Sequence, residues 1–347
     1  MKTKLLLLVI VCIAVTSFLY GCNNISQQKA EPYRKQIFAL DTIIDLTIYD
    51  SRGEELSVLS ENRINELEQK MSAQINTGEV SMINSSENRS ITVSSDTYNV
   101  IKNACEVSER TDGALDITVY PLVKLWGFPM GNYRVPSKNE IDTLLQSVDH
   151  TSIKTNDDDM SVSVPTGTQI DLGAAAKGYI SDDIRTLLKE NGVESAVLSF
   201  GGNVVTIGCK NGENWRIGVK YPYSEDNYAI LDVSETSIVT SAADQRYFTE
   251  NGKQYHHIID PKTGYPSNSG LISVTVICES AVYADCLSTA LFVMGKDKAI
   301  EYYNTYKDFD FIMLDSDNNM YYTSGLKNSF SINDDYSFLN STIIAAD

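Results

Sequence analysis

Apolar side chains recur along the chain at two spacings, which predict strands in some segments and helices in others. The segment from Phe38 to Asp50 is rich in β-branched residues and partly alternates apolar with polar positions, so we predict one strand there. Residues 57–71 predict a helix, because their apolar side chains recur every three or four positions. The side chains expected on its buried face are Leu59, Ile64, Leu67 and Met71.

Capping residues mark the ends of three further helices. One is expected to start at Ser94 or Ser95 and to end before Gly113. The next covers residues 174–192 and stops at Asn191 and Gly192, a common C-terminal signal. The third runs from Ser280, as N-cap, to Gly295.

Strands and helices follow each other without strict alternation, which favours an α+β fold. Further strands are predicted at residues 195–203, 214–222, 228–241 and 271–277, and residues 137–169 form a polar excursion with a short helix. We therefore expect a single mixed α/β domain over residues 34–340, built mainly of antiparallel sheets with packed helices.

The first residues resemble a bacterial lipoprotein signal. Two lysines precede an apolar run that is shorter than the roughly 20 residues of a spanning helix, and "LYGC" closes it at Cys22. The resemblance predicts a signal peptide over residues 1–21, a lipid on Cys22 and a polar tether over residues 22–33. A plain signal peptide cleaved elsewhere is the alternative. The expected location is the extracytoplasmic face of the cell membrane, held by the lipid.

The chain is acidic, with a formal net charge of −18. The leader contains two lysines and no acid, which leaves −20 for the rest. Nucleic acid is excluded as a partner, because phosphate binding needs a basic face. Six cysteines include no CxxC pair, so neither a zinc ribbon nor a thioredoxin-type motif is indicated. Cys105 and Cys286 fall on apolar helical faces and are interpreted as core residues.

The predicted helix near the C-terminus carries one charged residue, Asp285. Ser288 and Thr289 follow at i+3 and i+4, so the carboxylate and both hydroxyls share one face. A buried carboxylate is costly unless it is paired or bound to a cation, and oxygen ligands of this kind suit Mg²⁺. The spacing alone fits equally an exposed aspartate on a half-buried helix.

Other segments carry weaker signals for a binding site. Asp171, a glycine turn and Lys177 at a helix start fit an anion site, although an ordinary turn has the same pattern. Asp116 could contact a ligand or cap a turn, and Trp126 is interpreted as core. The glycine pair in "SFGGNV" would let a ligand approach the backbone, although it is equally typical of a tight turn. Arg246 could contact a ligand or form a structural ion pair.

Two of the three histidines stand side by side at His256 and His257. In an extended segment their side chains point to opposite faces, so at most one of them faces a given cleft. A histidine that faces a cleft can act as a general base near neutral pH.

These segments together resemble the ApbE family of FAD:protein FMN transferases. The motifs that carry the resemblance are "DGALDITVYPLVKLWGF", "IDLGAAAKGYISDD", "FGGNV", "TSAADQRYF", "HHIIDPKTGYP" and "YADCLSTALFVMG". The resemblance implies transfer of FMN from FAD to a Thr or Ser hydroxyl of a partner protein, with Mg²⁺ and release of AMP. The implied partner is an extracytoplasmic redox protein or a subunit of an ion-pumping redox complex.

The resemblance also assigns roles to residues of this chain. The implied metal ligands are Asp285, Thr289 and the carbonyl of Ala174, with assistance from Ser288. His257 matches the proposed base. The residues implied to hold FAD are Leu40, Ala114, Leu115, Asp116, Asp171, Lys177 and Ile259.

Four residues depart from the family pattern: Leu40, Leu115, Ala242 and Asp244. Many members have Met at the first position, commonly Phe at the second, Gly at the third and an aromatic residue at the fourth. Because of Ala242 and Asp244, we expect the loop near the acceptor site to differ from that of other family members. Two other functions fit the same residues: an FAD pyrophosphatase that yields FMN and AMP, and a non-catalytic FAD-binding lipoprotein.

Overall fold

The computed structural model describes residues 31–345 of the chain. The predicted signal peptide (residues 1–21), the lipidation site Cys22 and most of the predicted tether (residues 22–33) lie outside the described residues. From Pro32 onward the chain forms one compact unit. No helix between residues 31 and 345 is long and apolar enough to cross a bilayer.

A nine-stranded sheet forms the centre of this unit, in the order β1-β2-β6-β7-β10-β13-β14-β15-β17. Its neighbouring strands pair antiparallel except β15 and β17, which are parallel. The strands of this sheet are β1 (Tyr33–Ala39), β2 (Thr42–Ile48), β6 (Ser195–Phe200), β7 (Asn203–Gly208), β10 (Ser237–Ala242), β13 (Leu271–Cys278), β14 (Asp310–Asp315), β15 (Asn319–Thr323) and β17 (Asn340–Ile344). The mixed, mainly antiparallel fold predicted from the sequence is confirmed.

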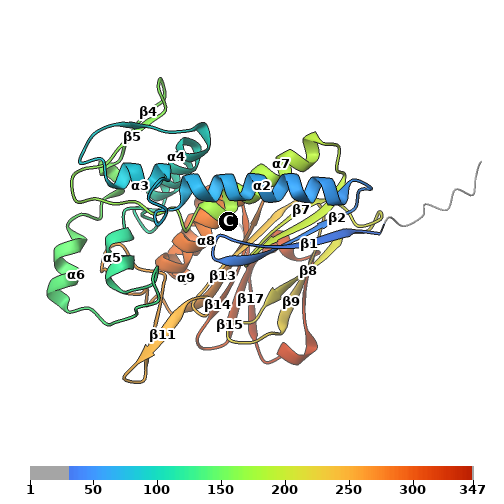
Figure 1. Ribbon diagram of the computed structural model, residues 1–347. Coiled ribbons are helices and arrows are strands. Elements are labelled where there is room, and N and C mark those ends of the chain that lie inside the picture. The colour runs from blue at the N-terminus through green and yellow to red at the C-terminus, as the bar shows by residue number, and fades with distance from the viewer. Residues whose placement is uncertain (1–30, 346–347) are drawn as a thin grey trace, which may run out of the picture. The chain divides into compact units, whose positions relative to one another are not determined.

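Eight helices are described, and the longer ones cover one face of the sheet (Figure 1). They are α2 (Gly53–Met71), α3 (Glu79–Asn84), α4 (Ser95–Arg110), α5 (Tyr120–Leu125), α6 (Lys138–Leu145), α7 (Ala176–Glu190), α8 (Ala281–Met294) and α9 (Lys296–Tyr306). Apolar side chains of α2, α4, α7 and α8 pack with those of β1, β2, β6 and β7 into one core. A second core lies between α8, α9 and strands β10, β13 and β14.

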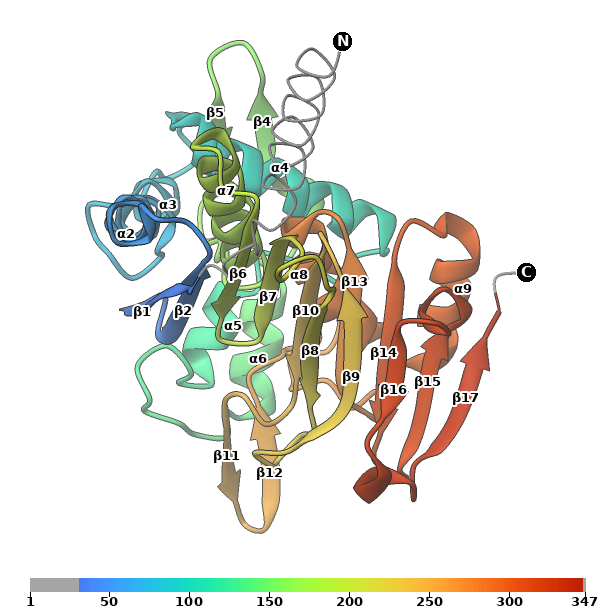
Figure 2. The same cartoon turned by 90° about the vertical axis from the view of Figure 1, so that its right-hand side faces the viewer.

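A smaller sheet covers part of the other face. It contains β16 (Phe330–Ile332), β9 (Asn227–Val233) and β8 (Trp215–Lys220), in that order. Ile238 of β10 and Ile277 of β13 point into the core between the two sheets, which places those strands in the middle of three layers (Figure 2). Two further small sheets are β3-β5-β4 and the hairpin β11-β12. Their strands are β3 (Ile91–Thr92), β5 (Ser161–Ser163), β4 (Lys154–Asn156), β11 (Tyr247–Glu250) and β12 (Lys253–His256).

The single strand predicted from Phe38 to Asp50 is wrong, because the chain reverses in the middle of that segment. β1 and β2 form a hairpin, with Ala39 opposite Thr42. Leu40 and Asp41 make the turn with φ of 55° each. The left-handed region is unusual for leucine, and the Leu40 N–H donates a hydrogen bond to Glu68 Oε1 (2.8 Å), which helps to hold the turn.

The predicted ends of α8 are confirmed, but α2 begins at Gly53, before the predicted residue 57, and one side chain predicted to be buried is exposed. Ser280 accepts a hydrogen bond from the Tyr283 N–H, and Gly295 ends α8 with a φ of 77°. Leu59 is wrong as a core residue, since it is 43% exposed. The buried stripe of α2 instead contains Leu56, Ser57, Ser60, Ile64, Leu67 and Met71.

Candidate active site

A cavity of about 600 Å³ opens beside α7 and α8, within the size range of sites for small molecules. All but one of the site residues expected from the sequence line it. Those that do are Leu40, Ala114, Leu115, Asp116, Asp171, Ala174, Lys177, His257, Ile259, Asp285 and Thr289. The exception is Ser288, which is fully buried.

Close contact between α7 and α8 fixes the position of Asp285. Gly178 permits that contact, because a Cβ at this position would meet backbone atoms of Ala281 and the Cβ of Asp285. The Gly178 N–H donates a hydrogen bond of 2.8 Å to Asp285 Oδ2. Glycine at the third position of α7 therefore places a free N–H of the first helical turn on the carboxylate.

Asp285 is a nearly buried carboxylate without a cationic partner. It is 4% exposed, and among residues 31–345 no Lys, Arg or His forms an ion pair with it. The two readings of Asp285 that the sequence left open are thereby separated, and the buried one is confirmed. A carboxylate in such a place favours an additional cation.

Two neutral oxygen atoms complete a set that suits a hard cation. In the described part of the chain no backbone N–H donates to the Ala174 carbonyl, which lies just before the first residue of α7. Thr289 stands one helical turn after Asp285 on the same face. The donors present are therefore a carboxylate, a carbonyl and a hydroxyl, all typical ligands of Mg²⁺, and the site fits this ion.

Ser288 lies behind this set. Its hydroxyl donates to the Asp285 carbonyl (3.0 Å) and lies 2.8 Å from the hydroxyl of Ser241. In this arrangement the Ser288 hydroxyl makes no direct bond to a ligand in the cavity.

Two cationic side chains line the cavity, Lys177 and Arg246. The Lys177 ammonium donates a long hydrogen bond to the Gly173 carbonyl (3.4 Å), and Arg246 approaches Asp41 at 3.5 Å. Burial raises the pKa of Asp171, and the two cations oppose that shift. These two side chains offer local positive charge to an anionic ligand, in a cavity that five carboxylates also line.

His257 and His256 point to different surroundings, as predicted. His257 lines the cavity, and its Nδ1 lies 3.2 Å from the Arg246 carbonyl. A carbonyl only accepts, so Nδ1 carries the proton and Nε2 has the lone pair. His256 Nε2 contacts the Ser267 carbonyl (2.9 Å), outside the cavity. Burial, with Lys177 adding to it, lowers the pKa of His257 to about 3, so the free protein holds a neutral imidazole at pH 7.

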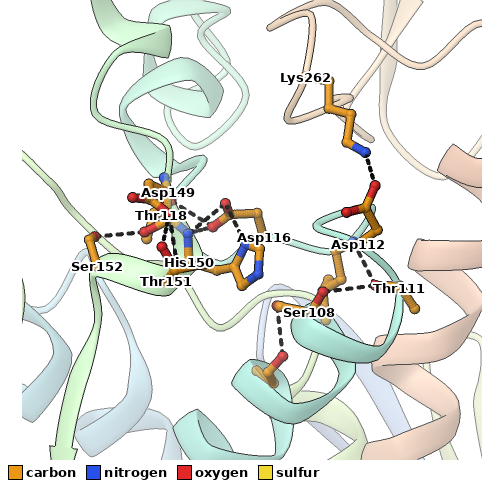
Figure 3. Close-up of polar contacts among 12 residues, drawn as sticks. Ser108, Thr111, Asp112, Asp116, Thr118, Asp149, His150, Thr151, Ser152 and Lys262 are labelled. Atoms are coloured by element: carbon orange, nitrogen blue, oxygen red, sulfur yellow. Dashed lines mark hydrogen bonds and ion pairs between the residues drawn. The ribbon is translucent and has the colours of Figure 1, made fainter.

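Asp116 is engaged by the protein itself (Figure 3). Oδ1 accepts hydrogen bonds from the N–H (2.8 Å) and hydroxyl (2.6 Å) of Thr118, and Oδ2 accepts from the His150 N–H (2.9 Å). The His150 ring nitrogen Nδ1 is 3.5 Å from the same oxygen. Asp116 thus joins the loop of Ala114 and Leu115 to residues 149–150. No role could be assigned to His150 from the sequence, because its hydrogen bond to Asp116 joins segments that are distant in the chain.

Asn203 is a second residue that the sequence analysis missed. It lines the cavity at the start of β7, is 1% exposed, and its Nδ2 atom has no hydrogen-bond partner among the described residues. An unpartnered buried amide costs about 1–3 kcal/mol, which favours a ligand that supplies the missing partner. The signal in the sequence was the glycine pair before it, which we interpreted as a place of close backbone approach or a tight turn.

Ala242 and Asp244, the two residues of the acceptor loop that depart from the family pattern, cause no backbone strain. Ala242 ends β10 in an extended conformation that alanine adopts freely. Asp244 accepts a hydrogen bond from the Tyr223 N–H (2.8 Å). The loop thus uses a polar contact where an aromatic side chain is common.

Comparison with known proteins identifies the family of this chain. The ApbE family model matches residues 40–313. A FAD:protein FMN transferase of Klebsiella pneumoniae (strain 342) is 34% identical over 244 residues, which are 70% of this chain and 76% of the relative. The corresponding enzyme of Vibrio cholerae is 32% identical over 302 residues, or 84% of this chain and 89% of the relative.

Solved structures show the same fold. The ApbE protein of Thermotoga maritima superimposes with a TM-score of 0.77 at 33% identity, over 89% of this chain and 99% of the other. The flavin transferase ApbE of Vibrio cholerae gives a TM-score of 0.77 at 27% identity, over 86% and 99% of the two chains.

Proposed function

This chain belongs to the ApbE family and is a FAD:protein FMN transferase, and we propose that it acts with Mg²⁺ on a threonine or serine hydroxyl of an acceptor protein. The observation that carries the metal-dependent part is the buried, unpaired carboxylate of Asp285, next to the free carbonyl of Ala174 and the hydroxyl of Thr289. These three residues would hold the cation.

Two cationic side chains of the cavity can meet the charge of FAD, in a lining that also contains five carboxylates. Its pyrophosphate carries two negative charges, and Lys177 and Arg246 are the cations in position to meet them. Bound Mg²⁺ would neutralise the pyrophosphate and stabilise the charge on the departing AMP. Phosphoryl transfer depends mainly on positioning and electrostatics, which these fixed groups provide.

In the proposed reaction the acceptor oxygen attacks the phosphorus on the FMN side of the pyrophosphate. The new P–O bond joins FMN to the acceptor, and the bond from that phosphorus to the bridging oxygen breaks, so AMP leaves with the electron pair. The proton of the attacking hydroxyl passes to Nε2 of His257, whose Nδ1–H is held by the Arg246 carbonyl. No other reactant is needed.

The location and the acceptor class are part of the proposal. A lipid on Cys22 would hold the enzyme at the extracytoplasmic face of the cell membrane, as the leader pattern predicts. The acceptor would be an extracytoplasmic redox protein or a subunit of an ion-pumping redox complex, exposed on the same side.

The test combines the chain from Asn24 with FAD, Mg²⁺ and a domain that carries an Asp-Gly-x-Ser/Thr-Gly-Ala-Thr-like acceptor segment. Intact mass should show that the acceptor gains one FMN, and EDTA or the Asp285→Ala substitution should abolish the gain. Asp232→Ala, at an exposed position of β9, is the matched control and should retain it. Free FMN and AMP with an unlabelled acceptor would show a pyrophosphatase instead, and intact FAD would show a binding protein.

A further inference from the structure

Three hydroxyl groups lie in a row that begins at Thr289, one of the oxygen donors of the cavity. Ser241, near the end of β10, reaches two of them on α8, which packs against that strand (Figure 2). Its Oγ is 2.8 Å from Ser288 Oγ and 3.1 Å from Thr289 Oγ1. Ser241 is itself 8% exposed and borders the cavity. No role was assigned to Ser241 from the segment "TSAADQRYF" in the sequence.

The direction of each hydrogen bond in this row follows from counting protons. A hydroxyl has one proton to donate and lone pairs with which to accept. Ser288 donates its proton to the Asp285 carbonyl (3.0 Å), because a carbonyl cannot donate. The Ser241–Ser288 contact then requires the proton of Ser241, and the Ser241–Thr289 contact requires the proton of Thr289. One arrangement alone satisfies all three bonds.

This arrangement leaves the Thr289 oxygen with its proton turned toward Ser241. Its lone pairs are then available for a cation in the cavity. Without Ser241, the Thr289 hydroxyl would rotate freely, and part of the time its proton would occupy the place of the metal ion.

We propose that Ser241 is a positioning residue that sets the Thr289 hydroxyl as a metal ligand through the row Thr289–Ser241–Ser288–Asp285 carbonyl. This inference rests on the metal-dependent part of the proposed function. It assigns Ser288 a place behind the ligands, where it fixes the direction of the row. Partners that orient metal ligands typically change metal affinity by about 10–100-fold when removed.

A purely structural role would look different. Ser237, four residues earlier on the same strand, is fully buried, donates to the Glu279 carbonyl and lies away from the cavity. Ser237→Ala is therefore the matched control, since it removes a buried serine hydroxyl from β10 without touching the row.

The experiment measures Mn²⁺ binding by the electron paramagnetic resonance signal of the free ion, with and without FAD, and Mg²⁺ by competition. Ser241→Ala should weaken Mn²⁺ binding about tenfold or more. Ser241→Thr, which keeps the hydroxyl, should restore most of the affinity, and Ser237→Ala should keep it even where its melting temperature falls. Ser288→Ala gives a second reading if Ser241→Ala folds poorly. Removal of the Ser288 hydroxyl leaves the Ser241 proton free to point at Thr289, so Ser288→Ala should also weaken Mn²⁺ binding.

Two outcomes would overturn the inference. Wild-type affinity in both Ser241→Ala and Ser288→Ala would show that the row does not set the ligand, while the metal site and the transferase activity would stand. Absence of Mn²⁺ binding by the wild type, with and without FAD, would remove the metal site and the role of Ser241 together. FMN transfer that persists in EDTA would then identify a metal-independent transferase.

Discussion

Replacement of Gly178 by alanine sets two effects of opposite sign against each other. By helix propensity alone, Gly→Ala inside α7 should stabilise the protein by about 1 kcal/mol. The structure predicts the reverse. A Cβ at residue 178 would lie 2.7 Å from the Ala281 carbonyl carbon and from the Asp285 Cβ, where ordinary contact begins at 3.4 Å. α8 would have to retreat by at least about 0.7 Å, the difference of these distances, and further to clear the Ala281 carbonyl oxygen, which lies nearer still.

The magnitude follows from the two interactions that are lost. Overpacking between two helices costs about 1–3 kcal/mol. Loss of the bond from the Gly178 N–H to the buried Asp285 carboxylate costs about 1.5–3 kcal/mol more. After the gain in propensity, Gly178→Ala should destabilise the protein by about 1.5–5 kcal/mol. For a domain of this size that corresponds to a fall in Tm of roughly 5–15 °C.

The assay is thermal and urea unfolding followed by circular dichroism, in EDTA so that metal binding does not contribute. Thr186→Ala, on the exposed face of the same helix, is the control and should change stability by roughly 0.5 kcal/mol at most. A Tm of Gly178→Ala equal to or above that of the wild type would refute the close contact of α7 and α8 and the account of Asp285 built on it.

Three further predictions concern residues of the cavity. Asp285→Asn should abolish FMN transfer, yet leave the unfolding free energy in EDTA equal to or above that of the wild type, because it removes a buried charge without a cationic partner among residues 31–345. A less stable variant would indicate a cationic partner of Asp285 that the structure does not show. The pKa of His257 in the folded protein is about 3, below the usual 6.5, so the folded protein without ligand binds fewer protons than the unfolded chain and should lose stability as pH falls from about 6.5 toward 3. Urea titrations at a series of pH values should show a smaller loss of stability for His257→Gln. A loss identical to that of the wild type would contradict the shifted pKa. Asn203→Ala should weaken FAD binding in fluorescence titrations while the Tm without FAD changes little, since its amide nitrogen has no partner to lose within residues 31–345. Unchanged FAD affinity would show that the ligand does not reach Asn203.

Features set by neighbouring residues could be predicted from the sequence. The ends of α8 follow from Ser280 and Gly295, whose capping depends on residues within one helical turn. The shared face of Asp285 and Thr289 follows from helical spacing. The opposite directions of His256 and His257 follow from the extended chain.

Features set by distant residues could not be predicted. Spacing left the burial of Asp285 open, and Gly178, 107 residues away, decides it by allowing α7 and α8 to touch. The turn at Leu40 contains no glycine, so a strand pattern continued through it. The directions of Ser241 and Asn203 depend on the register of β10 and β7, in which Val239 lies opposite Asn203.

The most direct test of the central claim is a crystal structure of the protein with FAD and Mn²⁺, in which anomalous scattering locates the metal. We expect one Mn²⁺ peak bound by the Ala174 carbonyl, the Asp285 carboxylate and the Thr289 hydroxyl, in contact with the pyrophosphate of FAD. A peak at any other group of residues, or FAD bound in the cavity with no metal beside Asp285, would contradict it.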